Sequence, residues 1–217
     1  MILKSFGCSF IYGTDLADDG LAMIKSKPSK LTWPSLIAQS LNYEYQCYAK
    51  PGIGNLRISE QVLSQAYCEP SLFVVGWTWI DRFDYTSDSD QWQTIVPVDS
   101  TVQANAYYKY LHSQYRDKFT TLSAIKLTID TLRQNGHRFI MTSIDDLTFE
   151  TEWHTTPAVM ALQDYIRPCI STFDYQNFLE WSRAKGFDIS GGSHPLEQAH
   201  QAAAAQVLDN IGSCIKV

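Results

Sequence analysis

The chain has few of the features that mark nucleic-acid-binding or membrane-spanning proteins. It carries 17 Lys and Arg residues against 23 Asp and Glu, a formal net charge of −6, and no run of basic residues. That balance gives no electrostatic support for binding nucleic acid or an anionic membrane surface. The longest apolar run, from Leu72 to Ile80, is far too short to cross a bilayer. We therefore expect neither a nucleic-acid partner nor a membrane partner.

Cysteines are few, odd in number and scattered. They are Cys8, Cys47, Cys68, Cys169 and Cys214, with no C-x-x-C pair and no Cys/His spacing typical of metal ligands. This pattern predicts buried free thiols in a reducing compartment instead of a metal site. The N-terminus has one lysine and only a few apolar residues before the first candidate site, which argues against a removable signal peptide. We expect a soluble protein that is cytoplasmic or virion-associated.

The remaining composition is that of a globular protein. The 217 residues are 45% hydrophobic, which is enough to bury one core and is most simply a single domain over 1–217. Internal repeats and low-complexity segments are absent from the sequence. Residues 81–100 turn polar and aromatic without helical periodicity, which predicts a long surface loop. With the helical pattern up to residue 135, this makes a long loop and helical insertion around 81–135.

Strand-like and helix-like patterns alternate along the chain. Strands are predicted at Ile2–Ser5, Tyr43–Tyr48, Leu72–Val75 and Arg138–Thr142, and helices near 32–41, 56–67, 102–135, 158–165, 175–185 and 196–211. This order predicts an α/β fold with a doubly wound, mainly parallel sheet between helix layers, a flavodoxin-like three-layer α/β/α arrangement. In such sheets, reactive groups gather outside the carboxyl ends of the strands.

A serine and a histidine stand at two such positions. Ser9 follows the first strand within the segment Gly7 to Gly13, and His194 precedes the last helix. A serine on a tight turn at a strand end can act as a nucleophile when a histidine takes its proton. Taken singly, Ser9 could merely cap a turn and His194 could be an ordinary loop residue. Their joint placement favours a catalytic role for both. The thiol of Cys8 is a less favoured nucleophile, because neighbouring side chains on a turn point apart.

These segments resemble the SGNH, or GDSL, hydrolase family. Its first block, GDS-x-x-x-G, is similar to Gly7-Cys8-Ser9-Phe10-Ile11-Tyr12-Gly13, with Cys8 in place of the aspartate. The resemblance implies that Ser9 is the nucleophile and that its amide helps to bind the oxyanion. Pro51-Gly52-Ile53-Gly54-Asn55 resembles the second block. Gly52 is then the implied amide donor to the oxyanion, with Gly54 as the alternative.

The third and last blocks depart from the family pattern. Gly76-Trp77-Thr78-Trp79 has Thr78 where the family's G-x-N-D block places an asparagine donor. Loss of one such donor typically costs roughly 3 to 4 kcal/mol of transition-state stabilisation. Thr78 is interpreted either as a weaker oxyanion donor or as a strand-end residue between packed tryptophans.

The last block, D-x-x-H, is matched at His194 but has Gly191 in place of the aspartate. Asp188, three residues further upstream, is the candidate acid that would orient the imidazole. Ser190 or Ser193 could bond the ring instead. Without an acid, the site would work more slowly as a serine–histidine dyad.

The resemblance implies a serine esterase that hydrolyses small, acetyl-like esters, in one version on carbohydrate, with Asn55, Trp77 and Arg82 facing the substrate. No metal or organic cofactor is implied. Aromatic residues between Asp81 and Pro97 could stack on sugar rings, or could equally belong to the core. Three alternatives stay open: a weak or inactive glycan-binding or virion-associated protein with the same fold, an acyltransferase using the same serine, and a flavodoxin-like phosphate-binding protein. The last is disfavoured, because the Ser9 turn lacks an anion-cradle pattern.

Overall fold

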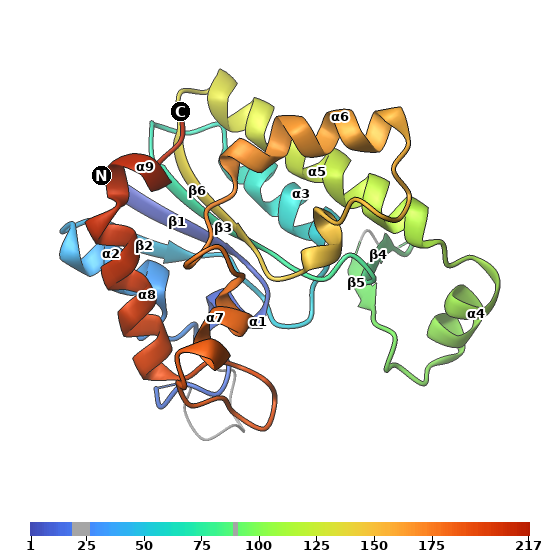
Figure 1. The fold of residues 1–217 in the computed structure, drawn as a ribbon, viewed down its shortest axis with the longest axis horizontal. Coiled ribbons are helices and arrows are strands. Elements are labelled where there is room, and N and C mark those ends of the chain that lie inside the picture. The colour runs from blue at the N-terminus through green and yellow to red at the C-terminus, as the bar shows by residue number, and fades with distance from the viewer. Residues whose placement is uncertain (19–26, 89–90) are drawn as a thin grey trace.

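A computed structural model describes residues 1–18, 27–88 and 91–217. Residues 19–26, between the predicted strand Ile2–Ser5 and the predicted helix near 32–41, and residues 89–90, part of the loop expected over 81–100, lie outside the described residues. A four-stranded sheet with the order β2-β1-β3-β6 forms the centre (Figure 1), and every neighbouring pair of its strands is parallel. The predicted α/β class and parallel sheet are confirmed.

The strands of this sheet are β1 (Ile2–Gly7), β2 (Glu44–Cys47), β3 (Leu72–Trp77) and β6 (Arg138–Ser143). All six residues of β3 are buried, because helices cover both faces of the sheet. Side chains alternate between two cores, with Val74 in one cluster and Phe73 and Val75 in the other. Gly7 pairs with Gly76, so the carboxyl ends of β1 and β3 meet at one edge.

Helices form a layer on each face of the sheet (Figure 1). One layer holds α1 (Ser9–Tyr12), α2 (Trp33–Ser40), α7 (Phe178–Ala184) and α8 (Glu197–Asp209). The other holds α3 (Asn55–Gln65), α5 (Gln114–Gln134) and α6 (Pro157–Ile166). Short turns complete the chain at η1 (Asp146–Thr148), η2 (Arg167–Cys169) and α9 (Ile211–Cys214).

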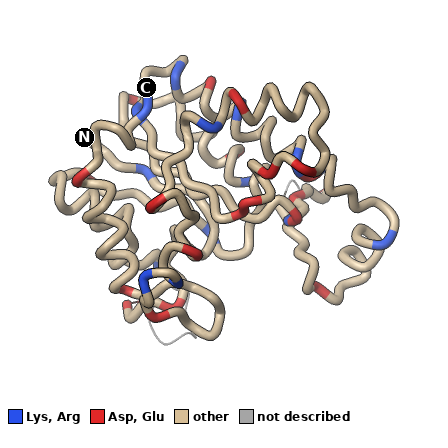
Figure 2. Tube along the Cα trace, viewed as in Figure 1, with Lys and Arg blue, Asp and Glu red and all other residues tan. Residues whose placement is uncertain are grey.

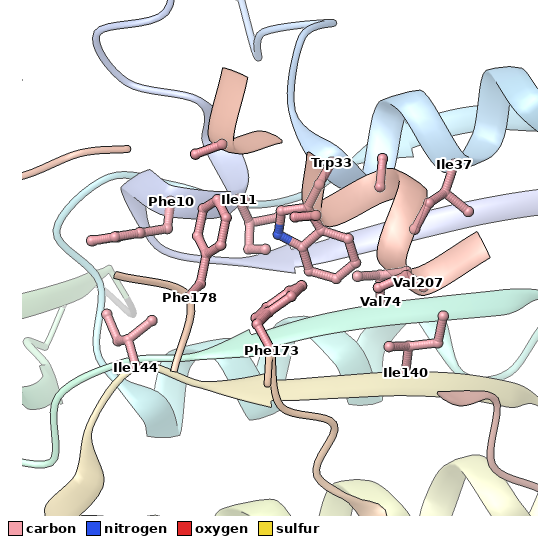
Figure 3. Packing of buried hydrophobic residues seen from close by; sticks show 14 of the residues in the cluster. Phe10, Ile11, Trp33, Ile37, Val74, Ile140, Ile144, Phe173, Phe178 and Val207 are labelled. Carbon is pink, nitrogen blue, oxygen red and sulfur yellow. The ribbon is translucent and has the colours of Figure 1, made fainter. Parts of the chain in front are cut away.

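An aromatic cluster fills the core on the α2 and α8 side. Figure 3 shows Phe173 and Phe178 beside Trp33, with Phe10, a residue of α1, at one end of the labelled group. The ring centroids of Trp33 and Phe173 are 6.1 Å apart in an edge-on contact, and those of Phe173 and Phe178 are 5.3 Å apart. Phe10 therefore links the core to the residue that precedes it, Ser9.

The segment predicted as a surface loop instead contains an antiparallel hairpin. Strands β4 (Phe83–Thr86) and β5 (Trp92–Ile95) are followed by α4 (Val102–Tyr110), and these elements project beyond one end of the sheet (Figure 1). They have a small core of their own, in which Phe83 stacks on Tyr107 at 4.2 Å between centroids. By contrast α5, which the sequence places in the same insertion, packs against α3 and α6 as part of a main layer.

Charged residues of both signs are dispersed along the described part of the chain. Figure 2 shows Lys and Arg interspersed with Asp and Glu along the Cα trace. In the described part of the chain, none of the helices combines the length and apolar character that crossing a membrane requires.

Candidate functional site

Ser9 is placed at the carboxyl end of β1 by a glycine that no other residue could replace without a clash. A Cβ on Gly7 would lie 2.7 Å from Ile11 Cγ1 and 2.8 Å from the Gly76 carbonyl oxygen. Cys8 then caps α1, and Ser9 is its first residue, 7% exposed. Its amide belongs to the first helical turn, where N–H groups have no acceptor within their own helix. The sequence did not predict this four-residue helix, which is too short to show a periodic pattern.

His194 lies against the same short helix. Its ring meets the ring of Phe10 edge-on, with centroids 5.4 Å apart, and its side chain is 16% exposed. The described residues show no hydrogen bond between Ser9 Oγ and the imidazole. The fold thus brings the serine and the histidine to one edge of the sheet, joined through Phe10.

A carboxylate that the sequence did not single out contacts the imidazole. Asp15 Oδ2 lies 2.8 Å from Nδ1 of His194, and the hydroxyl of Ser190 donates to the same oxygen at 2.6 Å. These two hydrogen bonds, that of Ser190 first, lower the pKa of the Asp15 carboxyl below its usual value. Asp15 is therefore an anion at neutral pH. A signal in the sequence was the absence of an acid at Gly191, which required the acid to come from elsewhere.

Asp188, the predicted acid, is not the residue beside the imidazole. It is exposed, and its carbonyl oxygen accepts a hydrogen bond from the amide of Leu196 at 3.0 Å. Ser190, an alternative partner for the ring, lies in the site but bonds Asp15 and accepts from the His194 backbone amide at 3.2 Å. The spacing of Asp188 from His194 in the sequence does not determine which way its side chain points from an exposed loop.

The two glycines of the second block have different surroundings. Gly52 has a φ of +80°, is exposed, and has open space where a Cβ would stand. The amide of Gly54 donates to Asp84 Oδ1 at 3.0 Å, and a Cβ there would lie 2.6 Å from Asp84 Oδ2. The Gly54 amide is thus engaged by the hairpin, which leaves Gly52 as the donor implied by the resemblance.

Three residues predicted to face the substrate or the oxyanion are enclosed. Trp77 and Thr78 have 0% exposure and Asn55 has 3%. The amide of Thr78 donates to Asn55 Oδ1 at 2.8 Å, and Asn55 Nδ2 donates to the Thr78 carbonyl oxygen at 2.9 Å. Thr78 Oγ1 is buried and has no hydrogen-bond partner among the described residues. The Asn55 side chain therefore braces the end of β3 through the Thr78 backbone, and its Nδ2 also donates to Thr121 Oγ1 of α5 at 3.3 Å.

Arg82 lies near the candidate edge. Its Nη1 donates to the carbonyl oxygen of Ile53 at 3.0 Å, and its guanidinium carbon is 4.8 Å from the centroid of the Trp79 ring. Trp79 in turn meets Phe10 edge-on at 5.8 Å. A chain of contacts therefore joins the loop that carries Gly52 to the helix that begins at Ser9.

No group of three or more His, Cys, Asp or Glu side chains is arranged for a metal ion within the residues that the structure describes. The cysteines are all free. Cys8 and Cys169 are buried as predicted, Cys47 and Cys214 are partly buried, and Cys68 is exposed.

The four-stranded parallel sheet between two helix layers is the fold of the GDSL, or SGNH, lipolytic proteins and carbohydrate esterases. A GDSL lipolytic protein from Veillonella parvula has 14% identity and a TM-score of 0.52, over 96% of this chain and 97% of that one. An acetyl xylan esterase from Butyrivibrio proteoclasticus has 12% identity and a TM-score of 0.52, over 97% of this chain and 63% of that one.

A family 2 carbohydrate esterase with a carbohydrate-binding domain, from Corynascus thermopiles, has 13% identity and a TM-score of 0.53, over 98% of this chain and 66% of that one. The chain thus spans just under two thirds of the length of these two carbohydrate esterases. No protein-family model matches the sequence, and no curated protein matches it. The likeness is therefore one of fold.

Proposed function

We propose that this protein is a serine esterase that uses Ser9 as nucleophile and His194 as general base. One observation carries the proposal: the His194 ring packs on Phe10, the residue after Ser9, at the carboxyl edge of β1. Sheets of this type bind their ligands at that edge. The two residues come from opposite ends of the sequence, so their meeting is a property of the fold.

The proposed reaction balances within the site. Ser9 Oγ attacks the ester carbonyl while the Ser9 proton passes to Nε2 of His194, and the amides of Ser9 and Gly52 donate to the oxyanion. His194 returns the proton to the departing alcohol, which leaves an acyl group on Ser9. Water then attacks the acyl-enzyme by the same steps. Because Thr78 is enclosed, this mechanism uses two backbone donors instead of a third from a side chain.

For the substrate we propose small acyl esters, acetyl-like and carried on carbohydrate. The acetyl xylan esterase with this fold supports that class. Trp79 and Arg82, both partly exposed beside Phe10, supply a ring face and a cation that suit a polyhydroxylated alcohol. A single domain over 1–217 and a cytoplasmic or virion-associated location stay predictions.

A specific observation favours a second function, that of a non-catalytic glycan-binding protein with this fold. The serine makes no hydrogen bond to the imidazole in the described residues, and Thr78 is sealed from the surface. Both features would be expected of a site that has lost turnover. The experiment below separates the two functions.

Labelling with a fluorophosphonate, followed by intact-mass measurement, tests nucleophile activation without knowledge of the substrate. We expect a single adduct on the wild type and none on Ser9→Ala or His194→Ala, with esterase activity toward an acetyl ester falling by roughly 10³-fold or more. Ser64→Ala, at an exposed position on α3, is the matched control and should label like the wild type. A folded wild type that takes no adduct would favour the glycan-binding function.

A further inference from the structure

We propose that Asp15 is the acid that positions His194, so that nucleophile and acid come from one short segment of chain and only the histidine comes from another. The inference rests on the proposed function. It departs from the D-x-x-H arrangement that the resemblance implies, in which the acid would stand three residues before His194, at the position of Gly191. Asp15 acts through His194 and is therefore a positioning residue.

The first support is the contact itself. Asp15 Oδ2 is 2.8 Å from Nδ1, a distance at which the carboxylate accepts the Nδ1 proton. That tautomer leaves the lone pair of Nε2 available for the Ser9 proton, and the carboxylate stabilises the imidazolium that forms. Ser190 Oγ donates to the same carboxylate oxygen at 2.6 Å, which fixes the orientation of the acid.

The second support is that the Asp15 segment is anchored on both sides. Gly13 has a φ of +85°, and a Cβ there would lie 2.5 Å from Ser29 Cβ. Leu16 is 3% exposed, and the amide of Ala17 donates to Glu197 Oε1 at 2.6 Å. Glu197 is the first residue of α8, three positions after His194. The acid and the histidine are thus tied together at a second point beyond their own contact.

The third support is the shape of the loop that carries His194. The amide of Ser190 donates to the His194 carbonyl oxygen at 2.9 Å, which closes the loop. A Cβ on Gly192 would lie 2.9 Å from Asp15 Oδ2 and 3.0 Å from His194 Nδ1, so the Gly192 backbone covers the pair. Gly191, where the family pattern places the acid, has no atom within 4 Å of a Cβ. The loop 190–194 therefore leaves room beside His194 for Asp15, an acid from another segment of the chain.

The matched test replaces each candidate acid in the full-length protein: Asp15→Asn against Asp188→Asn. The first readout is the rate of fluorophosphonate labelling across pH. In Asp15→Asn an amide faces Nδ1 and can hold the opposite tautomer, so we expect labelling to slow by roughly 10²- to 10⁴-fold at neutral pH and its pH profile to change. Asp188→Asn should stay within about twofold of the wild type.

The second readout does not depend on activity. The proton of Nδ1, held by a carboxylate, should give a downfield resonance in the NMR spectrum. We expect it in the wild type, Ser9→Ala and Asp188→Asn, and its loss in Asp15→Asn and His194→Ala. A folding defect is recognised by the rest of the spectrum, and Asp15→Glu then serves as the second variant, with partial recovery of rate and resonance expected.

The outcomes separate this inference from the proposed function. If the wild type labels and Asp15→Asn labels equally fast, Asp15 has no positioning role and the esterase proposal stands alone. If the wild type does not label, the esterase proposal fails and the resonance decides the pairing. Persistence of the resonance in Asp15→Asn would overturn the inference, and its specific loss would uphold the pair.

Discussion

The carboxyl edge of the sheet has two sides, which differ in how far their polar side chains are exposed to solvent. The side that we propose to be catalytic, called the reactive side, is formed by Ser9, Asp15 and His194. There the acid and the imidazole bond each other and keep 40% and 16% of their side-chain surface exposed. On the brace side, formed by Asn55 and Thr78, the amide bonds backbone groups and is sealed. On the brace side the Thr78 hydroxyl is also buried and has no hydrogen-bond partner among the described residues, whereas the reactive side keeps its polar atoms partly exposed.

The largest expected effect comes from breaking the brace. Asn55→Ala removes the acceptor of the Thr78 amide and the donor to the Thr78 carbonyl oxygen, and leaves both buried. Unsatisfied buried groups cost more than the hydrogen bonds themselves contribute, so we expect the free energy of unfolding to fall by about 3 kcal/mol. Urea denaturation followed by tryptophan fluorescence measures this.

Asn105→Ala is the matched control for that experiment. Its side-chain amide also donates to a backbone carbonyl oxygen, that of Ser100 at 3.2 Å, but at an exposed position. A change within about 0.5 kcal/mol is expected there. If both variants lose the same stability, the burial of Asn55 is not what makes it a brace.

The next largest effect comes from disturbing the reactive side without replacing its acid or its base. Gly192→Ala places a methyl group within 3.0 Å of both Asp15 and His194, and the pair must separate to admit it. We expect kcat/KM toward an acetyl ester to fall on the order of 10²-fold, since small displacements of catalytic groups cost about that much. Because the loop is exposed, its stability should change little.

Gly191→Ala provides the comparison, because a Cβ at that position meets no atom within 4 Å. It should keep the wild-type rate within about twofold. Equal losses in the two variants would indicate that the loop needs glycine for its backbone alone, and not to cover the Asp15–His194 contact.

The position of Ser9 at the carboxyl edge was predictable, because the topology of the sheet determines it. Apolar β-prone runs such as Leu72–Val75 specify buried parallel strands, and a serine after the first strand must then lie at the carboxyl edge. Asp15 was missed because its contact joins residues 179 positions apart and depends on a left-handed φ of 71°. Neither spacing nor composition encodes such a pairing.

The enclosure of Asn55 and Trp77 was not predicted, for a different reason. Asn55 and Trp77 have the residue types of a substrate site, and only the elements packed over them decide that they are enclosed. The β4–β5 hairpin, which contacts the start of α3 through Asp84, was itself predicted as loop. Its signal was the alternation of Phe83, Asp84 and Tyr85, but Asp84 is the buried member, because its carboxylate accepts from the amides that begin α3. In β4 the polar residue is therefore the buried one, the reverse of the usual alternation of buried apolar and exposed polar residues.

The smallest expected effect compares two histidines on either side of the start of α8. His200 is 1% exposed, accepts from the Trp33 amide at 3.1 Å, and burial lowers its pKa from 6.5 to about 3. Between pH 6.5 and about 3, His200 therefore binds a proton in the unfolded chain but stays neutral in the folded protein. This contribution to stability is complete above pH 6.5 and is lost as the pH falls toward 3, at up to about 1.4 kcal/mol per pH unit.

Chemical denaturation at pH values between 4 and 7, for wild type and His200→Gln, measures that slope. The variant has no imidazole to protonate at this position, so its unfolding free energy should depend less steeply on pH, whatever its stability at pH 7. Parallel curves would mean that His200 takes up its proton equally in the folded and unfolded states, in contradiction to its burial between α2 and α8. A flatter curve would show that His200 contributes to stability as a buried neutral imidazole, a structural role distinct from the catalytic role proposed for His194.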